Sequence, residues 1–314
     1  MVPEELSAVP GGPLPIIVGP TASGKTALAL ALAERIPVEV VSCDSVQVYR
    51  GFDIGSSKAT QEERSRVPHH LLDLVDANEA FNAGMWARAA DGAIGAIRAA
   101  GRIPLVVGGS GLYLRALLHG LAEAPDVPVE VRDALELRWG KEGGAALHAE
   151  LLEVDPALGS RLPPGDRQRI VRALAVFHAT GKRLSALQEE HRFQEERYVP
   201  VTLGVTHARE VLNTRINGRV LAMLDQGLVQ EVESLLAAGA SPDSRPMQAT
   251  GYRQIVEMLT RGGSADDVIE GIQQSHRRYA KRQMTWFRSL EVAWMDSGDV
   301  AGVAARVEAV LGAD

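Results

Sequence analysis

Residues 19–26 read GPTASGKT and match the phosphate-binding loop (P-loop) pattern G-x-x-x-x-G-K-[ST]. In such a loop, backbone N–H groups point at an anion and the lysine adds a positive charge. Gly24 would let the backbone approach a polyphosphate closely, Lys25 would contact its phosphates, and Thr26 would hold a Mg²⁺ ion. We therefore predict a phosphate cradle formed by Gly19, Pro20, Thr21, Ala22, Ser23, Gly24, Lys25 and Thr26.

Asp44 directly follows the apolar run VEVVSC at residues 38–43. This position is typical of the carboxyl edge of a parallel sheet, where open α/β folds bind their ligands. A carboxylate there could accept a hydrogen bond from a substrate, act as a base, or hold a metal through water. It could also cap a helix N-terminus together with Ser45. The position favours the functional role.

A third apolar run, IPLVVGG at residues 103–109, leads into Gly108-Gly109-Ser110-Gly111 and contains no acid. Most P-loop enzymes place a metal-binding acid at the end of this strand. Its absence argues against a kinase or an ATPase, and leaves room for another substrate that carries a diphosphate.

Alternating strands and helices must position these residues. We predict strands at 14–18, 38–43 and 103–109, a helix that follows the P-loop and ends before Pro37, and a helix over 83–100. This alternation indicates an α/β fold with a parallel sheet covered by helices on both faces.

The character of the chain changes near residue 120. Residues 131–196 read as successive helices, broken at Gly143-Gly144, Asp155-Pro156 and Pro163-Pro164-Gly165. We therefore predict an α/β core of residues 1–118 and 199–314, interrupted by an all-helical insertion domain at 119–198.

The second part of the core begins with a predicted strand at 199–205. One long amphipathic helix is predicted over 209–238, with Leu221, Leu224, Leu228 and Leu235 on one stripe. A last short strand is predicted at 291–296.

The composition indicates a soluble globular chain. Its 314 residues suffice for an α/β core plus a smaller domain. No apolar run approaches the ~18 residues that cross a membrane, and the N-terminal MVPEELSAVPGGP lacks the basic and apolar regions of a secretion signal. The lone cysteine, Cys43, cannot form an intramolecular disulfide and is interpreted as an inert thiol. We expect a cytoplasmic protein without membrane association.

A basic segment at residues 275–289 stands out because the net charge of the chain is −7. Clustered cations with interleaved aromatic residues are typical of surfaces that bind the phosphates and unstacked bases of RNA. The segment has no acid and contains Arg277, Arg278, Tyr279, Lys281, Arg282, Trp286, Phe287 and Arg288.

Six ordered sequence blocks span about residues 19–288: GPTASGKT, DSVQVYRGFDIGSSK, VVGGSGLYLRAL, DRQRIVRALAVF, GYRQ and AKRQMTWF. With these blocks the chain resembles the tRNA dimethylallyltransferase family. The resemblance implies a nucleotide-kinase-like P-loop core that binds the diphosphate of dimethylallyl diphosphate. It also implies transfer of the dimethylallyl group to the exocyclic amine of the tRNA adenosine just 3′ of the anticodon, giving N6-isopentenyladenosine and diphosphate.

The resemblance further implies catalytic roles for Asp44, Ser110, Lys25 and Arg219. Asp44 would take a proton from the amine. Ser110 stands where many relatives have threonine and would hydrogen-bond the oxygen between the prenyl carbon and the diphosphate. Arg219 would clamp the diphosphate beside Lys25, and Mg²⁺ would neutralise it. Arg215, one turn before Arg219, is expected on a solvated helix face.

Other matching segments predict tRNA-binding residues. These are Asp44, Ser45, Val46, Gln47, Ser110, Arg132, Gln168, Arg169, Ile170, Val171, Arg172, Gln248, Gly251, Tyr252 and Arg253, and the basic segment adds Arg277, Arg278, Lys281 and Arg282. We expect a monomer whose partners are tRNA and dimethylallyl diphosphate.

Two other enzymatic functions share part of this pattern. An isopentenyltransferase acting on free AMP, ADP or ATP would need the P-loop and Asp44, but neither the insertion nor the basic segment. A P-loop kinase would need the acid that is missing after the third strand. A non-catalytic RNA-binding module would not need Lys25, Thr26 and Asp44 together. The insertion and the basic segment favour tRNA.

Overall fold

The computed structural model describes residues 11–121, 125–191, 195–296 and 298–311. The chain divides into two compact units, and we call Met1–His119 with Glu196–Asp314 the core unit, and Gly120–Glu195 the insertion unit. These bounds lie close to the predicted ones. Of the N-terminal segment used to predict that the protein is not secreted, residues 1–10 lie outside the described residues.

Six parallel strands form the sheet of the core unit, in the order β3-β2-β4-β1-β5-β6. The predicted α/β class with a parallel sheet is confirmed. All five predicted strands are present, and the two-residue β3 is an addition at the edge. The strands are β1 Pro13–Val18, β2 Val38–Cys43, β3 His69–His70, β4 Ile103–Gly108, β5 Val199–Val205 and β6 Ala293–Met295.

Helices cover both faces of this sheet. On one face α2 (Lys25–Ala33) and α15 (Val300–Leu311) pack together and onto the central strands, around a core that includes Ile17, Leu105 and Val303. On the other face α4 (Ala83–Ala99) packs on β2, β4 and α5 (Gly111–His119). The rings of Trp86 and Tyr113, from α4 and α5, stack with their centroids 5.1 Å apart. The short α3 (Gln61–Arg66) completes the first half of the core unit.

The predicted single helix over 209–238 is wrong. The structure has two helices, α11 (Arg209–Asp225) and α12 (Leu228–Ala237). They are separated by Gly227, whose φ of +98° lies in the left-handed region that favours glycine. The predicted leucine stripe changes with this break, because Leu221 is 47% exposed. The buried side of α11 is formed instead by Leu212, Ile216, Val220 and Met223.

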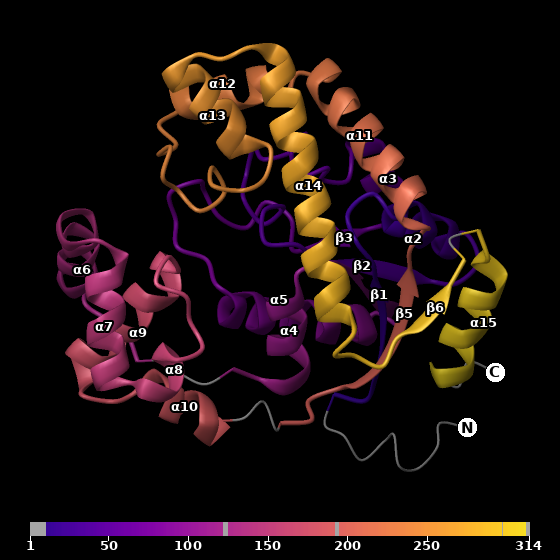
Figure 1. The fold of residues 1–314 in the computed structure, drawn as a ribbon. Coiled ribbons are helices and arrows are strands. Elements are labelled where there is room, and N and C mark those ends of the chain that lie inside the picture. The colour runs from indigo at the N-terminus through magenta and orange to yellow at the C-terminus, as the bar shows by residue number, and fades with distance from the viewer. Residues whose placement is uncertain (1–10, 122–124, 192–194, 297, 312–314) are drawn as a thin grey trace. The chain divides into compact units, whose positions relative to one another are not determined.

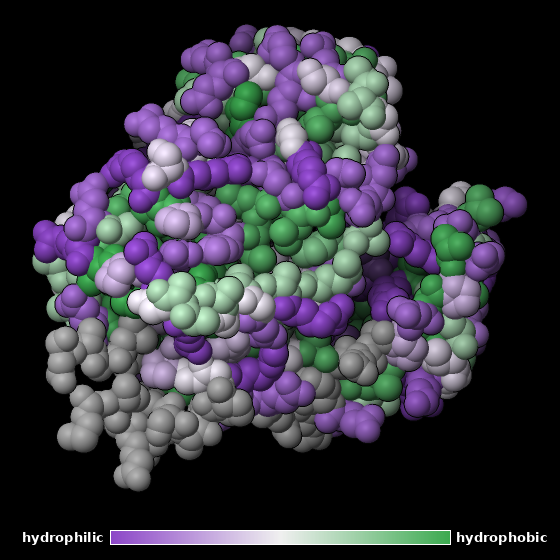
Figure 2. Space-filling view, turned by 180° about the vertical axis from the view of Figure 1, so that it is seen from behind, coloured by the Kyte–Doolittle hydropathy of each residue, from purple (hydrophilic) through white to green (hydrophobic). Residues whose placement is uncertain are grey.

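The core unit continues with α13 (Tyr252–Arg261) and the 23-residue α14 (Ala265–Phe287). In Figure 1, α14 runs beside α11 from the region of α12 and α13 down to the chain that enters β6. Hydrophilic and apolar side chains are mixed at the top of the space-filling view (Figure 2). One side of α14 is buried, at Ile272, His276, Ala280, Gln283 and Phe287.

The insertion unit is helical, as predicted. Its own core contains buried side chains from several helices, among them Leu135, Leu147, Leu151, Ile170 and Leu174. Within the part of the chain that the structure describes, no helix is both long and apolar enough to cross a membrane. The helices are α6 Val129–Glu142, α7 Gly144–Val154, α8 Pro156–Gly159, α9 Arg167–Thr180 and α10 Leu184–His191.

Candidate active site

Three neighbouring strands end together at the carboxyl edge of the sheet. Gly108 of β4 is paired with both Val18 of β1 and Cys43 of β2. The next residues of the three strands are Gly19 of the P-loop, Asp44 and Gly109, so register alone brings the P-loop, Asp44 and the Ser110 loop side by side. This edge is where open α/β sheets bind ligands.

The P-loop borders a cavity of about 360 Å³. Its lining comprises residues 22–27 together with Arg215 and Arg219. The Nζ atom of Lys25 donates to the carbonyl oxygens of Gly19 and Pro20, at 2.9 Å each. Three cationic side chains, those of Lys25, Arg215 and Arg219, thus line one small cavity suited to a polyanion.

Both arginines of α11 reach the P-loop side of this cavity. Nε of Arg215 donates to the carbonyl oxygen of Ala22 at 2.8 Å. Ala22 has a φ of +63°, and holding a non-glycine residue there costs on the order of 1 kcal/mol. The prediction that Arg215 merely lies on a solvated face is therefore wrong: its side chain is exposed, but it contacts the P-loop and lines the cavity beside Arg219.

The electrostatics of the cavity favour an anionic ligand. Burial, and then the charge of Arg219, lower the pKa of Lys25 to about 8, although the nearby Asp44 partly opposes this shift. The pKa of Arg219 is lowered by burial, while Asp44 raises it and Arg215 lowers it. Crowded, partly desolvated cations are stabilised when a diphosphate enters among them.

One carboxylate oxygen of Asp44 has a structural role. Its Oδ1 accepts from the backbone N–H groups of Val46, at 2.8 Å, and Gln47, at 3.2 Å. These bonds hold the turn at residues 45–48 rather than a helix N-terminus. The other oxygen, Oδ2, has no hydrogen-bond partner among the described residues, which leaves it available as an acceptor for a substrate.

Ser110 is held by its neighbours on the sheet edge. Its Oγ accepts from the backbone N–H of Ser45 at 3.1 Å, so the hydroxyl proton remains available for donation. Its carbonyl oxygen accepts from Sγ of Cys43 at 3.6 Å. Burial, and then Asp44, raise the pKa of this thiol well above its usual range, which agrees with the prediction of an inert cysteine.

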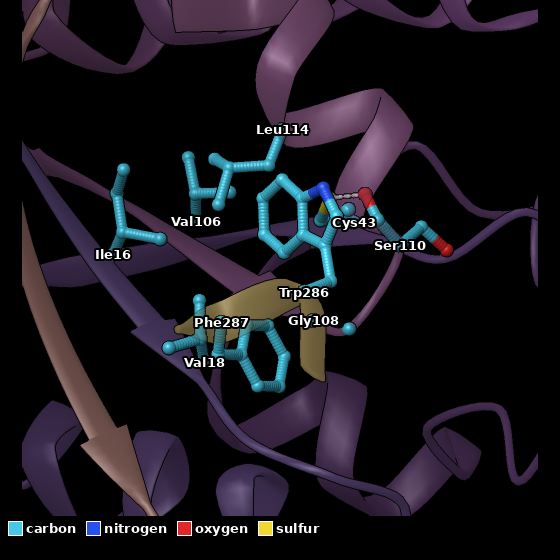
Figure 3. A pocket seen from close by; sticks show the side chains of 11 residues that line it. Ile16, Val18, Cys43, Val106, Gly108, Ser110, Leu114, Trp286 and Phe287 are labelled. Carbon is cyan, nitrogen blue, oxygen red and sulfur yellow. Dashed lines mark hydrogen bonds between the residues drawn. The ribbon is translucent and has the colours of Figure 1, made fainter. Parts of the chain in front are cut away.

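An apolar cavity lies behind Ser110 and is too narrow for a water molecule. Figure 3 shows the indole of Trp286 among Leu114, Cys43 and Phe287, with the Ser110 side chain pointing away from them. The aromatic residues of the basic segment therefore serve packing: Phe287 is 1% exposed and Trp286 packs against Gly111. The prediction that they stack on RNA bases does not fit these two residues.

Helix α14 adds groups that sequence reasoning did not assign to the site. Burial, followed by the charge of Arg219, lowers the pKa of His276 to about 4, and its Nε2 is buried without a hydrogen-bond partner in the described residues. The pKa of Tyr279 is raised by burial and then by the charge of Asp44, and the neighbouring Ser110 side chain partly opposes this shift. Gln283 contacts both active-site loops. The sequence did contain a signal for these residues, because His276 and Gln283 are polar residues on the otherwise apolar stripe of an amphipathic helix.

Thr26 has a hydroxyl oxygen, the kind of ligand that Mg²⁺ prefers, and therefore fits the role of a magnesium ligand. Its side chain is exposed and lines the cavity next to Lys25. Mg²⁺ in such sites is bound through few protein groups, substrate phosphates and several waters. Within the described ranges no group of three or more His, Cys, Asp or Glu side chains could hold a metal. A magnesium ion here would therefore depend on diphosphate oxygens in addition to Thr26.

Nine of the nineteen predicted tRNA-binding residues have exposed side chains. In the insertion unit Arg132 and Arg172 are close enough for their like charges to interact, and Nε of Arg169 donates to Asp166 at 2.7 Å. In the core unit Nη1 of Arg277 donates to Oδ1 of Asn217 on α11 at 2.6 Å, so the Arg277 side chain links α14 to α11. The exposed residues are Arg132, Gln168, Arg169, Arg172, Gln248, Arg253, Arg278, Lys281 and Arg282.

Five predicted tRNA-binding residues need correction because they are used inside the protein. Ile170 and Val171 are 0% and 3% exposed on the core side of α9. Gly251 is buried at the start of α13. Tyr252 is 0% exposed and donates to Glu231 at 2.6 Å. The amide of Gln47 accepts from Ser42 and donates to two backbone carbonyls, so its side chain holds the loop that follows β2.

The fold and this site define a P-loop α/β enzyme with an anion cavity, a carboxylate and a serine hydroxyl on one sheet edge. The model of the IPP transferase family matches residues 47–290, and that of the isopentenyl transferase family matches residues 13–76. The chain belongs to the IPP transferase family.

Individual relatives cover nearly the whole chain. It is 48% identical to tRNA dimethylallyltransferase 1 of Syntrophotalea carbinolica, over 95% of this chain and 96% of that protein. It is 50% identical to the tRNA dimethylallyltransferase of Geobacter sulfurreducens, over 88% of each chain. Among solved structures, the tRNA isopentenylpyrophosphate transferase of Bacillus halodurans matches with 36% identity and a TM-score of 0.70, over 95% and 96% of the two chains. A eukaryotic dimethylallyltransferase acting on tRNA matches with 26% identity and a TM-score of 0.77, over 96% and 78%.

Proposed function

We propose that this protein transfers the dimethylallyl group of dimethylallyl diphosphate to the exocyclic amine of the tRNA adenosine just 3′ of the anticodon. The observation that carries the proposal is the common end of β1, β2 and β4, which brings a cationic cavity, Asp44 and Ser110 together on one edge. Its relatives named tRNA dimethylallyltransferase support the same reaction.

The diphosphate lies in the P-loop cavity. Backbone N–H groups of the loop and the side chains of Lys25, Arg215 and Arg219 surround the negative oxygens. Lys25 turns from the carbonyls of Gly19 and Pro20 toward the diphosphate when it binds. A Mg²⁺ ion held by Thr26 and by the diphosphate would supply further neutralisation of the leaving group.

Ser110 and Asp44 act on the two bonds that change. The bond from the prenyl carbon to oxygen breaks, and its electron pair stays on the diphosphate, where the Ser110 hydroxyl donates to the bridging oxygen. The adenine nitrogen forms the new bond to the prenyl carbon, and its proton passes to the free carboxylate oxygen of Asp44. The amine lone pair is delocalised into the ring, so removal of this proton makes it a better nucleophile.

The tRNA requires a surface beyond the P-loop. The exposed cations of α14, namely Arg278, Lys281 and Arg282, supply charge in the core unit, and Arg132 and Arg172 supply charge in the insertion unit. Contacts of this kind hold the backbone while the target base leaves its stack. We place the reaction in the cytoplasm, which the single buried thiol supports. We further propose that the protein acts as a monomer.

One assay separates this function from its alternatives. The protein is incubated with radiolabelled dimethylallyl diphosphate and either bulk tRNA or AMP, without ATP. We expect label in tRNA, recovered as N6-isopentenyladenosine after nuclease digestion, and none on AMP. Label on AMP but not on tRNA would instead indicate an adenylate isopentenyltransferase. Transfer of labelled phosphate from ATP to a nucleotide would indicate a kinase.

A further inference from the structure

Helix α14 packs against three active-site elements of the core unit, the P-loop, α11 and α5. Its Ala280 packs with Ala22 of the P-loop and with Leu212 and Ile216 of α11, the helix that carries both cavity arginines. Its C-terminal end packs on α5, whose first residue follows Ser110. The buried stripe of α14 is apolar except at His276 and Gln283.

Gln283 is the polar residue of this stripe that bridges two loops. It is 6% exposed. Its Oε1 accepts from the backbone N–H of Thr21 in the P-loop, at 2.9 Å, and its Nε2 donates to the carbonyl oxygen of Gly109, at 3.2 Å. A buried side-chain amide that satisfies one backbone donor and one backbone acceptor fixes the positions of both loops.

The loop around Ser110 is shaped to receive α14. A Cβ atom on Gly109 would lie 2.0 Å from Nε2 of Gln283, and a Cβ atom on Gly111 would lie 2.3 Å from the indole of Trp286. Both distances are far below any real contact, so a side chain at Gly109 would displace the amide of Gln283, and one at Gly111 would displace the indole of Trp286. Ser110 is therefore flanked on each side by a residue against which α14 packs closely.

We propose that Gln283 is a positioning residue that fixes the Ser110 hydroxyl relative to the diphosphate cradle. The inference rests on the function proposed above. The diphosphate is held by the P-loop, and the oxygen that leaves the prenyl carbon must meet Ser110. Because Gln283 links Thr21 to Gly109, it sets the distance between these two groups without itself contacting the substrate. Displacements of about 1 Å in such pairs can cost about 100-fold in rate.

The test is a double-mutant cycle with Gln283→Met and Ser110→Ala. We expect Gln283→Met to lower kcat about 10- to 100-fold while KM for dimethylallyl diphosphate changes by less than about threefold, because ground-state binding uses the P-loop cations. In the Ser110→Ala background the same substitution should lower kcat by less than about threefold, because its effect passes through Ser110. Equal losses of kcat in both backgrounds would overturn the proposal.

A measurement without turnover tests the bridge directly. Hydrogen exchange is followed in peptides that cover the P-loop and residues 108–112. Gln283→Met should speed exchange in both peptides, and Gln283→Glu should speed it only at 108–112, because glutamate still accepts from Thr21 but cannot donate to Gly109. Gln274→Met, at an exposed glutamine of the same helix, is the matched control. Unchanged exchange in Gln283→Met would overturn the bridge, whereas a wild-type protein inactive on tRNA would overturn only the proposed function.

Discussion

The backbone N–H of Ser45 donates to Oγ of Ser110 across the edge of the sheet, although the two residues are 65 positions apart. Ser45 follows Asp44, the proposed base, and Ser110 is the proposed donor to the leaving oxygen. A single hydrogen bond thus links the Ser110 hydroxyl to the backbone of the residue next to Asp44. The in-register ends of β2 and β4 make this bond possible.

Replacing Asp44 by asparagine should remove the base and keep the fold. Asparagine retains an Oδ1 that can accept from the N–H groups of Val46 and Gln47, so the turn should survive. We expect kcat to fall about 10²- to 10⁴-fold, the usual effect of losing a general base. Diphosphate binding, measured as competitive inhibition by pyrophosphate, should be nearly unchanged. Near-normal turnover would remove Asp44 from the chemistry.

Replacing Ser110 by alanine should remove the donor to the leaving oxygen. We expect kcat to fall about 10²- to 10³-fold, as when one oxyanion donor is lost. Ser110→Thr retains the hydroxyl and should keep most of the activity, which makes it the matched control. If steady-state kinetics gave equal kcat values for the alanine and threonine variants, the hydroxyl would have no role in the reaction.

The pKa of Lys25, lowered to about 8, predicts a pH dependence of substrate capture. The lysine is protonated below this pKa and neutral above it, and only the protonated form attracts the diphosphate. We therefore expect kcat/KM for dimethylallyl diphosphate to be level up to about pH 8 and then to fall by about tenfold per pH unit. Lys25→Arg keeps its charge at these pH values and should lose this decline even if its activity is low. A level wild-type profile up to pH 10 would contradict the assignment.

The exposed cations of α14 should contribute to tRNA affinity. Each phosphate contact steepens the fall of affinity with salt by about 0.7 in the log–log slope for single strands. The double variant Arg278→Glu/Lys281→Glu should therefore bind tRNA more weakly and with a flatter salt dependence, with unchanged affinity for dimethylallyl diphosphate. Binding is measured by filter retention between low and moderate salt.

A matched charge change elsewhere provides the control for this experiment. Arg35 and Arg306 are exposed near α2 and on α15, which pack together against the sheet. Arg35→Glu/Arg306→Glu alters the net charge by the same amount and should leave the salt slope as in the wild type. If the two double variants had the same tRNA affinity and the same salt slope, the α14 cations would be solvent-exposed charges that do not contact tRNA.

The sequence by itself determined the features that depend on local pattern. The P-loop motif, the strands that precede Asp44 and Ser110, and the helical insertion were all predicted, because strand alternation, glycine turns and helix periodicity are encoded by neighbouring residues. Gly227 shows the limit of this approach. Helical periodicity continues across it, but its left-handed backbone divides the predicted helix into α11 and α12.

Only the tertiary structure decided which side chains meet. Thr21 and Gln283 are 262 positions apart, and no local pattern predicts their hydrogen bond. Likewise, Arg215 could have been solvated, and Tyr252 could have faced RNA, until packing fixed which side of each helix is buried. The physical reason is that a helix presents several possible faces. The face that becomes buried is selected by surfaces from distant parts of the chain, whose contacts outweigh local preference.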